Sequence, residues 1–439
     1  MKKGLLWVTL GLFFILMLSS CSDNKYPPSV YDPGEEYLAD PVISTVSPAT
    51  KTYQGVGIVT INGANFSTDM SNNQVTFNGV GAYIFQDESN ETTLKVKVPN
   101  VITDPAINII DSVKIRVAVI GALIFAVYPP DSTINFQLER ASVEWGGFGD
   151  LDLVHAVACD AGENLYVTTE DKLVFKVDST GAKADFGTTT STIVTGMRVG
   201  WNGDLYYARN YKYIYKVPST GGGSEKFNTT SLPDRGKAYD LDYDQNGNMI
   251  IAGKGNQSIW VMKSDASAVS YDAYTDFELI SCRVYNGYIY VAGLYTGDDT
   301  LEISEGVWKS AITAGADSQI GVRELVFDWS TYVGEDGPAL LSLAINEDGL
   351  LFLGAEEQYD GSDYVLGDAI TVYDETTGTA SSLYSEVLYP PSTNFCWGSS
   401  NYLYIVRNIS NPSATDAPTK RLIRVAFEFD GAPYYGRSL

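Results

Sequence analysis

Histidine is almost absent from this chain of 439 residues, and His155 is its only representative. Zinc centres draw on several histidine and cysteine ligands, so a histidine-rich zinc site is excluded. A serine–histidine–aspartate triad would have to use His155, which lies at the start of a predicted strand. A structural or pore-lining role is the better interpretation of this residue. A glycine-rich phosphate loop in the required strand-to-helix context is also missing.

Positive charge is scarce as well, because 29 Lys and Arg residues face 54 Asp and Glu residues and the net charge is −25. This balance disfavours nucleic acids and anionic membrane surfaces as partners. The segment Asp242–Gly247 resembles the start of a calcium loop, but its twelfth position is Gly253, where an EF-hand needs Glu. We therefore expect no cofactor, with calcium at this loop as the lesser alternative. Glycosidase-type carboxylate pairs stay open, because no spacing singles out one pair.

The apolar run Leu5–Leu18 is too short for a transmembrane helix and has the character of a signal peptide. It ends in Leu-Ser-Ser-Cys21, which resembles the bacterial lipobox. The resemblance implies cleavage after residue 20 and lipidation of Cys21. Ser22–Asn24 resembles the surface-export signal of Bacteroidetes lipoproteins, which implies a lipid-anchored protein of the outer membrane, exposed at the cell surface. Residues 21–40 are rich in proline and acid, and they predict an extended tether.

Residues 41–139 combine short alternating strands with Gly, Asn and Pro punctuation, which predicts a small β-sandwich. The predicted strands are Ile58–Asn62, Gln74–Phe77, Ala82–Gln86, Thr93–Val98, Lys114–Val119 and Thr133–Leu138. The segments Pro41–Pro48, Val59–Gly63, Val75–Gly79 and Lys97–Pro99 resemble the immunoglobulin-like IPT/TIG domains, and the resemblance implies a spacer. Val117–Val127 is too apolar for an exposed hairpin, so we expect one of its sides to pack against the following domain.

A polar or glycine-containing turn followed by a hydrophobic, often tyrosine-rich strand recurs six times in residues 140–439. The repeats are centred on Leu165, Leu205, Met249, Ile289, Leu351 and Leu403. Strand-like units recurring at about 40–60 residues predict a β-propeller, here with six blades. The repeats resemble NHL-type repeats. An open ring would leave two sheet edges, so we expect Ala141–Trp145 to supply the missing outer strand of blade 6. The predicted fold is all-β: an IPT/TIG sandwich and a six-bladed propeller.

The remaining cysteines, Cys159, Cys282 and Cys396, each fall on the innermost predicted strand of a blade. An odd number leaves at least one free thiol in an exported protein. We expect buried, inert thiols. A disulfide between Cys159 and Cys396 is conceivable, because the first and last blades are neighbours in a closed ring.

The second and third strands of blades 4, 5 and 6 are separated by enlarged loops at residues 294–306, 355–368 and 408–420. This position lies on one face of a propeller, beside the loops that join successive blades. Aromatic rings with nearby carboxylates and amides can stack on sugars and bind hydroxyl groups. The candidate ligand-binding residues on this face are Tyr295, Trp329, Tyr332, Tyr359, Asp360, Asp363, Tyr364, Tyr389 and Asn394.

These features predict a lipid-anchored surface protein that captures an extracellular polysaccharide or oligosaccharide on this face. The family resemblance adds an outer-membrane importer as a possible partner complex. A protein-interaction scaffold in an outer-membrane complex is the second hypothesis. A lyase or hydrolase is the third, and it requires an open, acid-lined pocket on the propeller axis.

Overall fold

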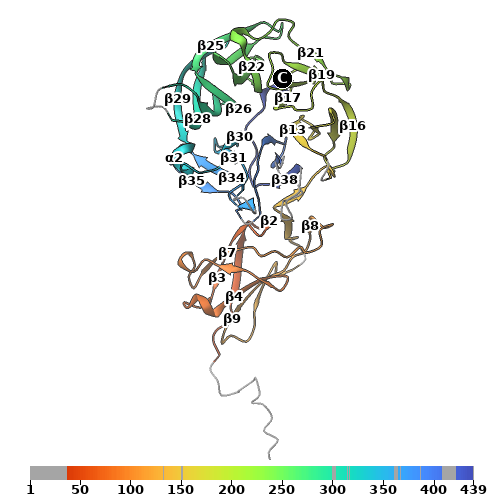
Figure 1. Ribbon diagram of the computed structural model, residues 1–439. Helices are drawn as coiled ribbons and strands as arrows, with labels where there is room; N and C mark the ends of the chain where they lie inside the picture. The colour runs from red at the N-terminus through yellow and green to blue at the C-terminus, as the bar shows by residue number, and fades with distance from the viewer. Residues whose placement is uncertain are drawn as a thin grey trace, which may run out of the picture. The chain divides into compact units, whose positions relative to one another are not determined.

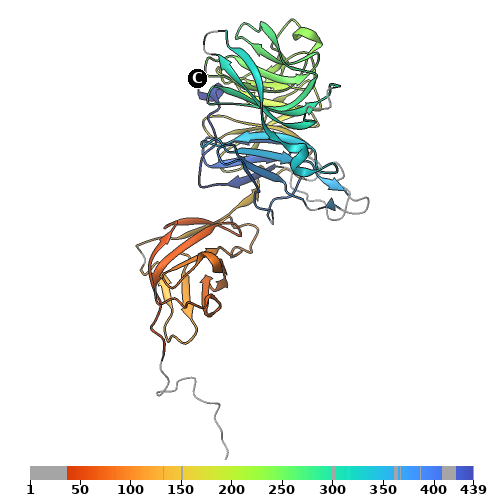
Figure 2. The same cartoon turned by 90° about the vertical axis from the view of Figure 1, so that its left-hand side faces the viewer.

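The computed structural model describes residues 37–131, 133–149, 152–298, 303–313, 315, 317–359, 364–365, 367–385, 387–407 and 422–438. The chain divides into two compact units. Unit 1 comprises Met1–Ser47, Thr60–Val96 and Lys114–Asp131, and unit 2 comprises Pro48–Val59, Lys97–Val113 and Ser132–Leu439. Both consist almost wholly of strands, so the predicted all-β class is confirmed (Figure 1 and Figure 2).

Unit 1 is built around a β-sandwich of two four-stranded sheets. One sheet has the order β1 (Val42–Ser47), β3 (Ile58–Ala64), β7 (Thr93–Lys97), β6 (Tyr83–Ile84). The other has the order β10 (Ala126–Tyr128), β9 (Ile115–Val119), β4 (Asn73–Phe77), β5 (Val80–Gly81). Alternate residues of β4 and β9, including Phe77, Ile115 and Val117, are completely or almost completely buried. This period of two is what a sandwich core requires.

Unit 2 contains six four-stranded antiparallel blades within the described residues. From the innermost strand outward, blades 1 to 3 are β13 (Val154–Cys159), β14 (Leu165–Thr169), β15 (Leu173–Val177), β16 (Lys183–Thr188); β17 (Gly196–Val199), β18 (Leu205–Ala208), β19 (Tyr215–Val217), β21 (Glu225–Lys226); and β22 (Lys237–Tyr243), β23 (Met249–Lys254), β24 (Gln257–Met262), β25 (Ala268–Thr275). Blades 4 to 6 are β26 (Phe277–Tyr285), β27 (Tyr288–Tyr295), β28 (Glu305–Thr313), β29 (Gln319–Asp328); β30 (Leu340–Ile345), β31 (Leu351–Ala355), β34 (Ile370–Asp374), β35 (Thr379–Ser382); and β36 (Asn394–Trp397), β37 (Tyr402–Val406), β38 (Leu422–Ala426), β12 (Ser142–Glu144).

The ring closes through β12, as the sequence predicts. This strand pairs antiparallel with β38, with Val143 opposite Arg424. The innermost strands follow one another around the axis, and β36 of blade 6 lies against β13 of blade 1. Figure 1 looks onto this ring, with β13, β17, β22, β26 and β30 nearest its centre. A strand from the start of the propeller sequence therefore completes its last blade and removes two open edges.

Apolar packing between blades forms the core of the propeller. Each pair of neighbouring blades encloses one cluster of buried residues. Trp260 lies in the cluster between blades 2 and 3, and Trp397 in the cluster between blades 5 and 6; both are fully buried. The Tyr-rich second strands supply much of this surface, because both of their faces meet a neighbouring blade.

The innermost strands share an irregularity that positions the axis residues. The register shifts by one residue at His155, Tyr239, Ile280 and Leu341, in blades 1, 3, 4 and 5. Each of these four side chains is half-buried between buried neighbours. A bulge of this kind bends a strand and redirects its side chains. The only histidine of the chain is thus a bulge residue at the inner edge of blade 1, and burial lowers its pKa.

The remaining elements are short. A third sheet, which belongs to unit 2, has the order β2 (Lys51–Gln54), β11 (Gln137–Arg140), β8 (Ile109–Ile110). Small pairs are made by β20 (Gly222–Gly223) with β16, and by β32 (Gln358–Tyr359) with β33 (Tyr364–Val365). The helical elements are η1 (Met70–Asn72), η2 (Gln86–Glu88), η3 (Pro233–Arg235), α2 (Trp329–Val333) and α3 (Tyr435–Ser438).

Candidate functional site

The enlarged loops of blades 4 and 5 meet beside the loop that joins these blades. The side chain of Glu305, where β28 begins, accepts the backbone N–H of Leu340 at 2.8 Å. The N–H of Glu356 donates to the carbonyl of Ala339 at 2.9 Å. Further along, the side-chain amide of Gln358 donates to the carbonyl of Asp336 at 2.9 Å. Each loop is therefore tied to the inter-blade loop by hydrogen bonds, and the predicted neighbourhood exists for these two blades.

An aromatic cluster lies at the same place. Asp328 pairs with Gly306 of β28 and its carboxylate accepts the N–H of Thr331, which starts α2. In this position the ring of Tyr332 lies 5.3 Å from Phe327 and 6.0 Å from Trp329. Tyr373 of blade 5 lies 4.5 Å from Phe327 on its other side. Tyr332 is 43% exposed, so it presents a supported aromatic ring to the solvent.

Two half-buried carboxyl groups accompany the cluster. Burial raises the pKa of Glu305, and the nearby Glu356 raises it further. Burial also raises the pKa of Glu356, with a second contribution from Glu357. Carboxyl groups of raised pKa that lie close together are typical of functional surfaces, because they retain unsatisfied capacity for hydrogen bonds or cations.

The structure divides the predicted site residues into three groups. Trp329 is 1% exposed and its indole N–H donates to the carbonyl of Pro338 at 2.7 Å, so it supports Tyr332 from inside. Asn394 is 4% exposed and its side-chain oxygen accepts the N–H of Val157 at 3.2 Å, which ties blade 6 to blade 1. Neither side chain has a surface to offer a ligand, and burial could not be read from their place in a predicted loop.

The other predicted residues lie nearer the surface or beyond the described part. Tyr295 is half-buried and packs 5.1 Å from Phe277, in the gap between blades 3 and 4. Tyr389 is half-buried in the loop before β36. Tyr359 and Tyr364 face each other across the β32–β33 pair. The remaining predictions, Asp360, Asp363 and the loop 408–420, lie outside the described residues.

The propeller axis holds a buried network of charges that the sequence reading missed. The carboxylate of Asp240 accepts hydrogen bonds at 3.0 Å from the side chains of Ser281 and Arg283, and it lies 3.6 Å from the Arg198 guanidinium. Arg283 also donates to the carbonyl of Phe395 at 2.9 Å. All three charged side chains are less than 5% exposed. One carboxylate therefore links blades 2, 3 and 4, and Arg283 extends the link to blade 6.

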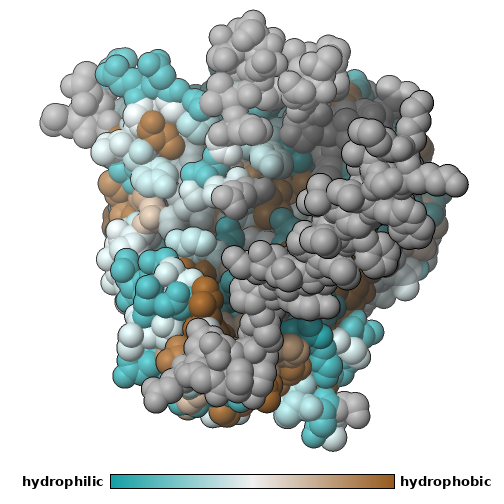
Figure 3. Space-filling view, turned by 90° about the horizontal axis from the view of Figure 1, so that it is seen from below, coloured by the Kyte–Doolittle hydropathy of each residue, from teal (hydrophilic) through white to brown (hydrophobic). Residues whose placement is uncertain are grey.

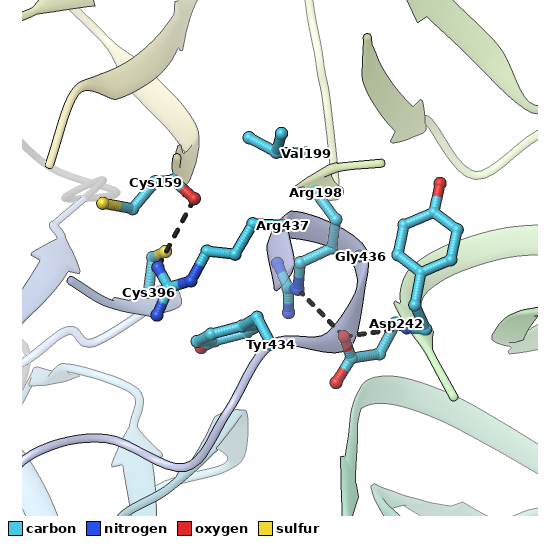
Figure 4. Close-up of a pocket in the computed structure, with 9 residues that line it drawn as sticks. Cys159, Arg198, Val199, Asp242, Cys396, Tyr434, Gly436 and Arg437 are labelled. Carbon is cyan, nitrogen blue, oxygen red and sulfur yellow. Dashed lines mark hydrogen bonds and ion pairs between the residues drawn. The ribbon is translucent and has the colours of Figure 1, made fainter. Parts of the chain in front are cut away.

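The C-terminal segment fills the axis next to this network. Tyr434 is 7% exposed, and the guanidinium groups of Arg198, Arg283 and Arg437 lie 5.5, 5.9 and 4.6 Å from its ring centre. Arg437 donates to the carbonyls of Trp397 and Gly398 at 2.9 and 2.7 Å. Figure 4 shows these side chains around the remaining space, a cavity of about 10 Å³. Such a cavity admits no more than a water molecule, so this part of the axis is plugged by the chain itself.

Asp242 gives the axis a pH-dependent contribution to stability. Burial raises its pKa from 3.8 to about 6, with Arg198 opposing this shift. Below pH 4 the carboxyl is protonated in both the folded and the unfolded chain. As the pH rises towards 6 the unfolded chain ionises first, so the folded state loses up to about 3 kcal/mol. Asp242→Asn lacks this titration. The stability of the variant relative to the wild type should therefore rise by about this amount between pH 4 and 7. Urea unfolding at several pH values measures it, and a constant difference would contradict the assignment.

The three described cysteines are free and buried, as expected. Burial raises the pKa of Cys159, Cys282 and Cys396, which keeps them as unreactive thiols. Cys159 and Cys396 both line the axis cavity (Figure 4).

The segment considered for calcium forms the turn between β22 and β23. Asp244 accepts the N–H groups of Asn246 and Asn248 at 2.8 and 2.9 Å and the hydroxyl of Ser318. Asp242 accepts the N–H groups of Tyr243 and Val284, both at 2.9 Å. The carboxylates are thus engaged by protein donors. Among the described residues, no three His, Cys, Asp or Glu side chains gather closely enough to hold a metal ion.

The axis network left a weak trace in the sequence. Asp240 and Asp242 alternate along a strand whose other residues are mostly apolar, and Arg198 and Arg283 sit at comparable places in blades 2 and 4. Charged residues are rarely buried unless they are paired. Charges that recur inside the innermost strands of a propeller therefore predict a paired cluster on the axis.

Comparison with known proteins supports the two-part architecture. Residues 41–134 match the model of the IPT/TIG domain family. No curated protein matches the chain. Among solved structures, a candidate phosphatase from Bacteroides thetaiotaomicron is 12% identical, with a TM-score of 0.52, over 91% of this chain and 99% of that one. An auxiliary nutrient-binding protein from Bacteroides ovatus is 14% identical, with a TM-score of 0.45, over 90% and 99%.

The propeller also resembles that of enzymes. A gluconolactonase from Xanthomonas campestris is 12% identical over 63% of this chain and 86% of its own, with a TM-score of 0.45. The structural neighbours thus include nutrient-binding proteins and propeller enzymes, and at these identities the likeness concerns the fold. Among the described residues, no helix is long and apolar enough to cross a membrane.

Proposed function

We propose that this chain is a binding protein, lipid-anchored through Cys21 at the surface of the outer membrane, that captures an extracellular glycan on the loop face of blades 4 to 6. The observation that carries the proposal is the exposed ring of Tyr332, held by Phe327 and Trp329 beside two half-buried carboxyl groups. A rigid aromatic ring offers a flat apolar surface to the C–H face of a sugar. Adjacent carboxylates accept hydrogen bonds from its hydroxyl groups.

The plugged axis favours binding over catalysis. Propeller enzymes need access to polar groups on the axis, but here Asp240, Asp242 and the nearby arginines are paired with one another and covered by Tyr434. Their hydrogen-bonding capacity is spent on linking blades. The exposed aromatic and acidic groups lie instead on the loops of blades 4 and 5.

Affinity electrophoresis of the full chain in gels containing soluble polysaccharides tests the proposal. At least one polysaccharide should retard the wild type, and Tyr332→Ala should weaken the interaction about fivefold, which corresponds to the loss of about 1 kcal/mol of stacking. Tyr211→Ala is the matched control, because Tyr211 is 40% exposed and lies between the second and third strands of blade 2. Equal effects of the two substitutions, or no retardation by any polysaccharide in a broad set, would sink the glycan hypothesis.

A protein partner is the second candidate, and a specific surface favours it. Val322 and Leu325 of β29 are 81% and 48% exposed, and Val269 of β25 is 54% exposed. These outermost strands of blades 3 and 4 lie against each other and border a groove of about 490 Å³. Apolar side chains on outer strands are typical of surfaces that receive another protein.

A further inference from the structure

One loop of unit 1 exposes a concentrated set of apolar side chains. Between β9 and β10, Ile120, Leu123, Ile124 and Phe125 are 57%, 59%, 63% and 47% exposed. The sequence led us to expect packing of this hydrophobic stretch against the following domain, but the structure leaves these side chains in contact with solvent. Figure 3, which looks from below onto Figure 1, shows hydrophobic residues exposed among hydrophilic ones. Large apolar side chains gathered on a surface indicate an interaction site.

The segment that enters unit 1 from the N-terminal side holds this loop in place. Leu38 donates its N–H to the carbonyl of Gly121 at 2.8 Å and forms a parallel bridge with Ala122. The carboxylate of Asp40 accepts the N–H groups of Leu123 and Ile124 at 3.2 and 2.9 Å. The backbone polar groups of the loop are thus satisfied internally while its side chains point outward, which lowers the cost of moving the tip into an apolar medium.

The chemistry of the loop matches a lipid surface. No charged residue occurs between Val117 and Pro130, in a chain that otherwise carries 83 charged side chains. The one carboxylate that reaches the loop, that of Asp40, is engaged by two backbone donors. The guanidinium of Arg116 lies 5.0 Å from the ring centre of Phe125, so the only nearby cation sits at the base of the tip. An apolar tip without charge, with a cation behind it, suits the boundary between acyl chains and headgroups.

The position of the loop along the chain identifies its occupant. Leu38, itself 56% exposed, lies beside the tip, and only 16 residues separate it from Cys21. We propose that the Ile120–Phe125 loop inserts into the bilayer to which the chain is anchored, as a second membrane contact that orients unit 1. This inference rests on the lipid anchor at Cys21 proposed above. A single acyl attachment leaves a protein free to swing, whereas an additional apolar contact fixes one face towards the lipid.

Depth-dependent fluorescence quenching tests the insertion on the full, acylated chain reconstituted into phosphatidylcholine vesicles. Ile124→Cys is labelled with bimane; the native Cys159, Cys282 and Cys396 are buried and do not compete for the label. The control is Tyr83→Cys, at a 65% exposed position of unit 1 on β6. Lipids with a spin label high on the acyl chain should quench bimane at residue 124 at least about twofold more than at residue 83. Adding Leu123→Ser and Phe125→Ser should remove the difference.

The outcomes separate the inference from the anchor. Flotation of the chain with vesicles but equal quenching at the two positions overturns loop insertion and leaves the anchor standing. A shift of the bimane emission at residue 124 without quenching by lipid also overturns it, because the tip is then covered by protein. Failure of the acylated chain to float removes the anchor and with it the inference.

Discussion

Replacing Tyr434 with Ala should lower the free energy of unfolding by about 3–5 kcal/mol, the usual cost of deleting a large buried aromatic side chain. The ring fills the axis and is 7% exposed, and its hydroxyl accepts the N–H of Trp397 at 3.3 Å. Removing it also uncovers the guanidinium groups of Arg198 and Arg283, which face the ring. Water would enter a site that now holds about 10 Å³ of free space. Urea unfolding followed by tryptophan fluorescence measures the loss.

Tyr434→Phe is the matched control for this prediction. It keeps the ring over the arginines and removes one hydroxyl, so it should cost about 1 kcal/mol, the usual net value of a single hydrogen bond. A loss of less than about 1 kcal/mol for Tyr434→Ala would mean that the C-terminal segment does not plug the axis in solution.

Asp240→Ala should be comparably damaging, at about 3–5 kcal/mol, because removing one partner of a buried ion pair leaves the other charge uncompensated. Here two arginines lose their shared carboxylate, together with the N–H of Cys282 and the hydroxyl of Ser281, each 3.0 Å from its Oδ2 atom. The same urea experiment reports the effect, and the variant should also unfold less cooperatively, because links between blades 2, 3 and 4 are lost.

Two further substitutions separate charge from packing. Asp240→Asn keeps the shape and one acceptor oxygen, so its cost should lie between those of the wild type and the alanine variant. Combining Asp240→Ala with Arg283→Met removes one orphaned charge and should restore part of the lost stability. If the double variant is no more stable than Asp240→Ala alone, the charge of Arg283 is not what makes the single substitution costly.

The repeated strands could be predicted from the sequence because their pattern has a direct physical cause. The second strand of every blade packs on both faces, so each is a short apolar run after a turn, and all six predicted centres lie within β14, β18, β23, β27, β31 and β37. The closing strand followed from the cost of open edges, and β12 lies within the predicted Ala141–Trp145. In the sandwich, β3, β4, β7 and β9 overlap the predicted strands, whereas Thr133–Leu138 precedes most of β11 (Gln137–Arg140).

The axis and the exact makeup of the loop face could not be derived in the same way. Tyr434 reaches the axis from a segment outside the repeats, and no local pattern encodes that return. Trp329 and Tyr332 stand in one helical turn with similar residue types, yet one is buried and the other exposed, because only tertiary packing decides which side meets Phe327 and Pro338. The apolar loop misled for a related reason: hydrophobic sequence predicts burial, but it does not say whether protein or lipid provides the cover.

The pairing of β12 with β38 also sets the order in which the molecule can be completed. Val143 and Arg424 are neighbours in the last blade although about 280 residues separate them along the chain. Contacts this distant in sequence form late and slow folding. During synthesis and export the strand around Val143 emerges early and waits, unpaired, until almost the whole chain has followed. A chain truncated anywhere before residue 422 would therefore lose its ring as well as its final blade, which makes the propeller an internal check that synthesis has reached its end.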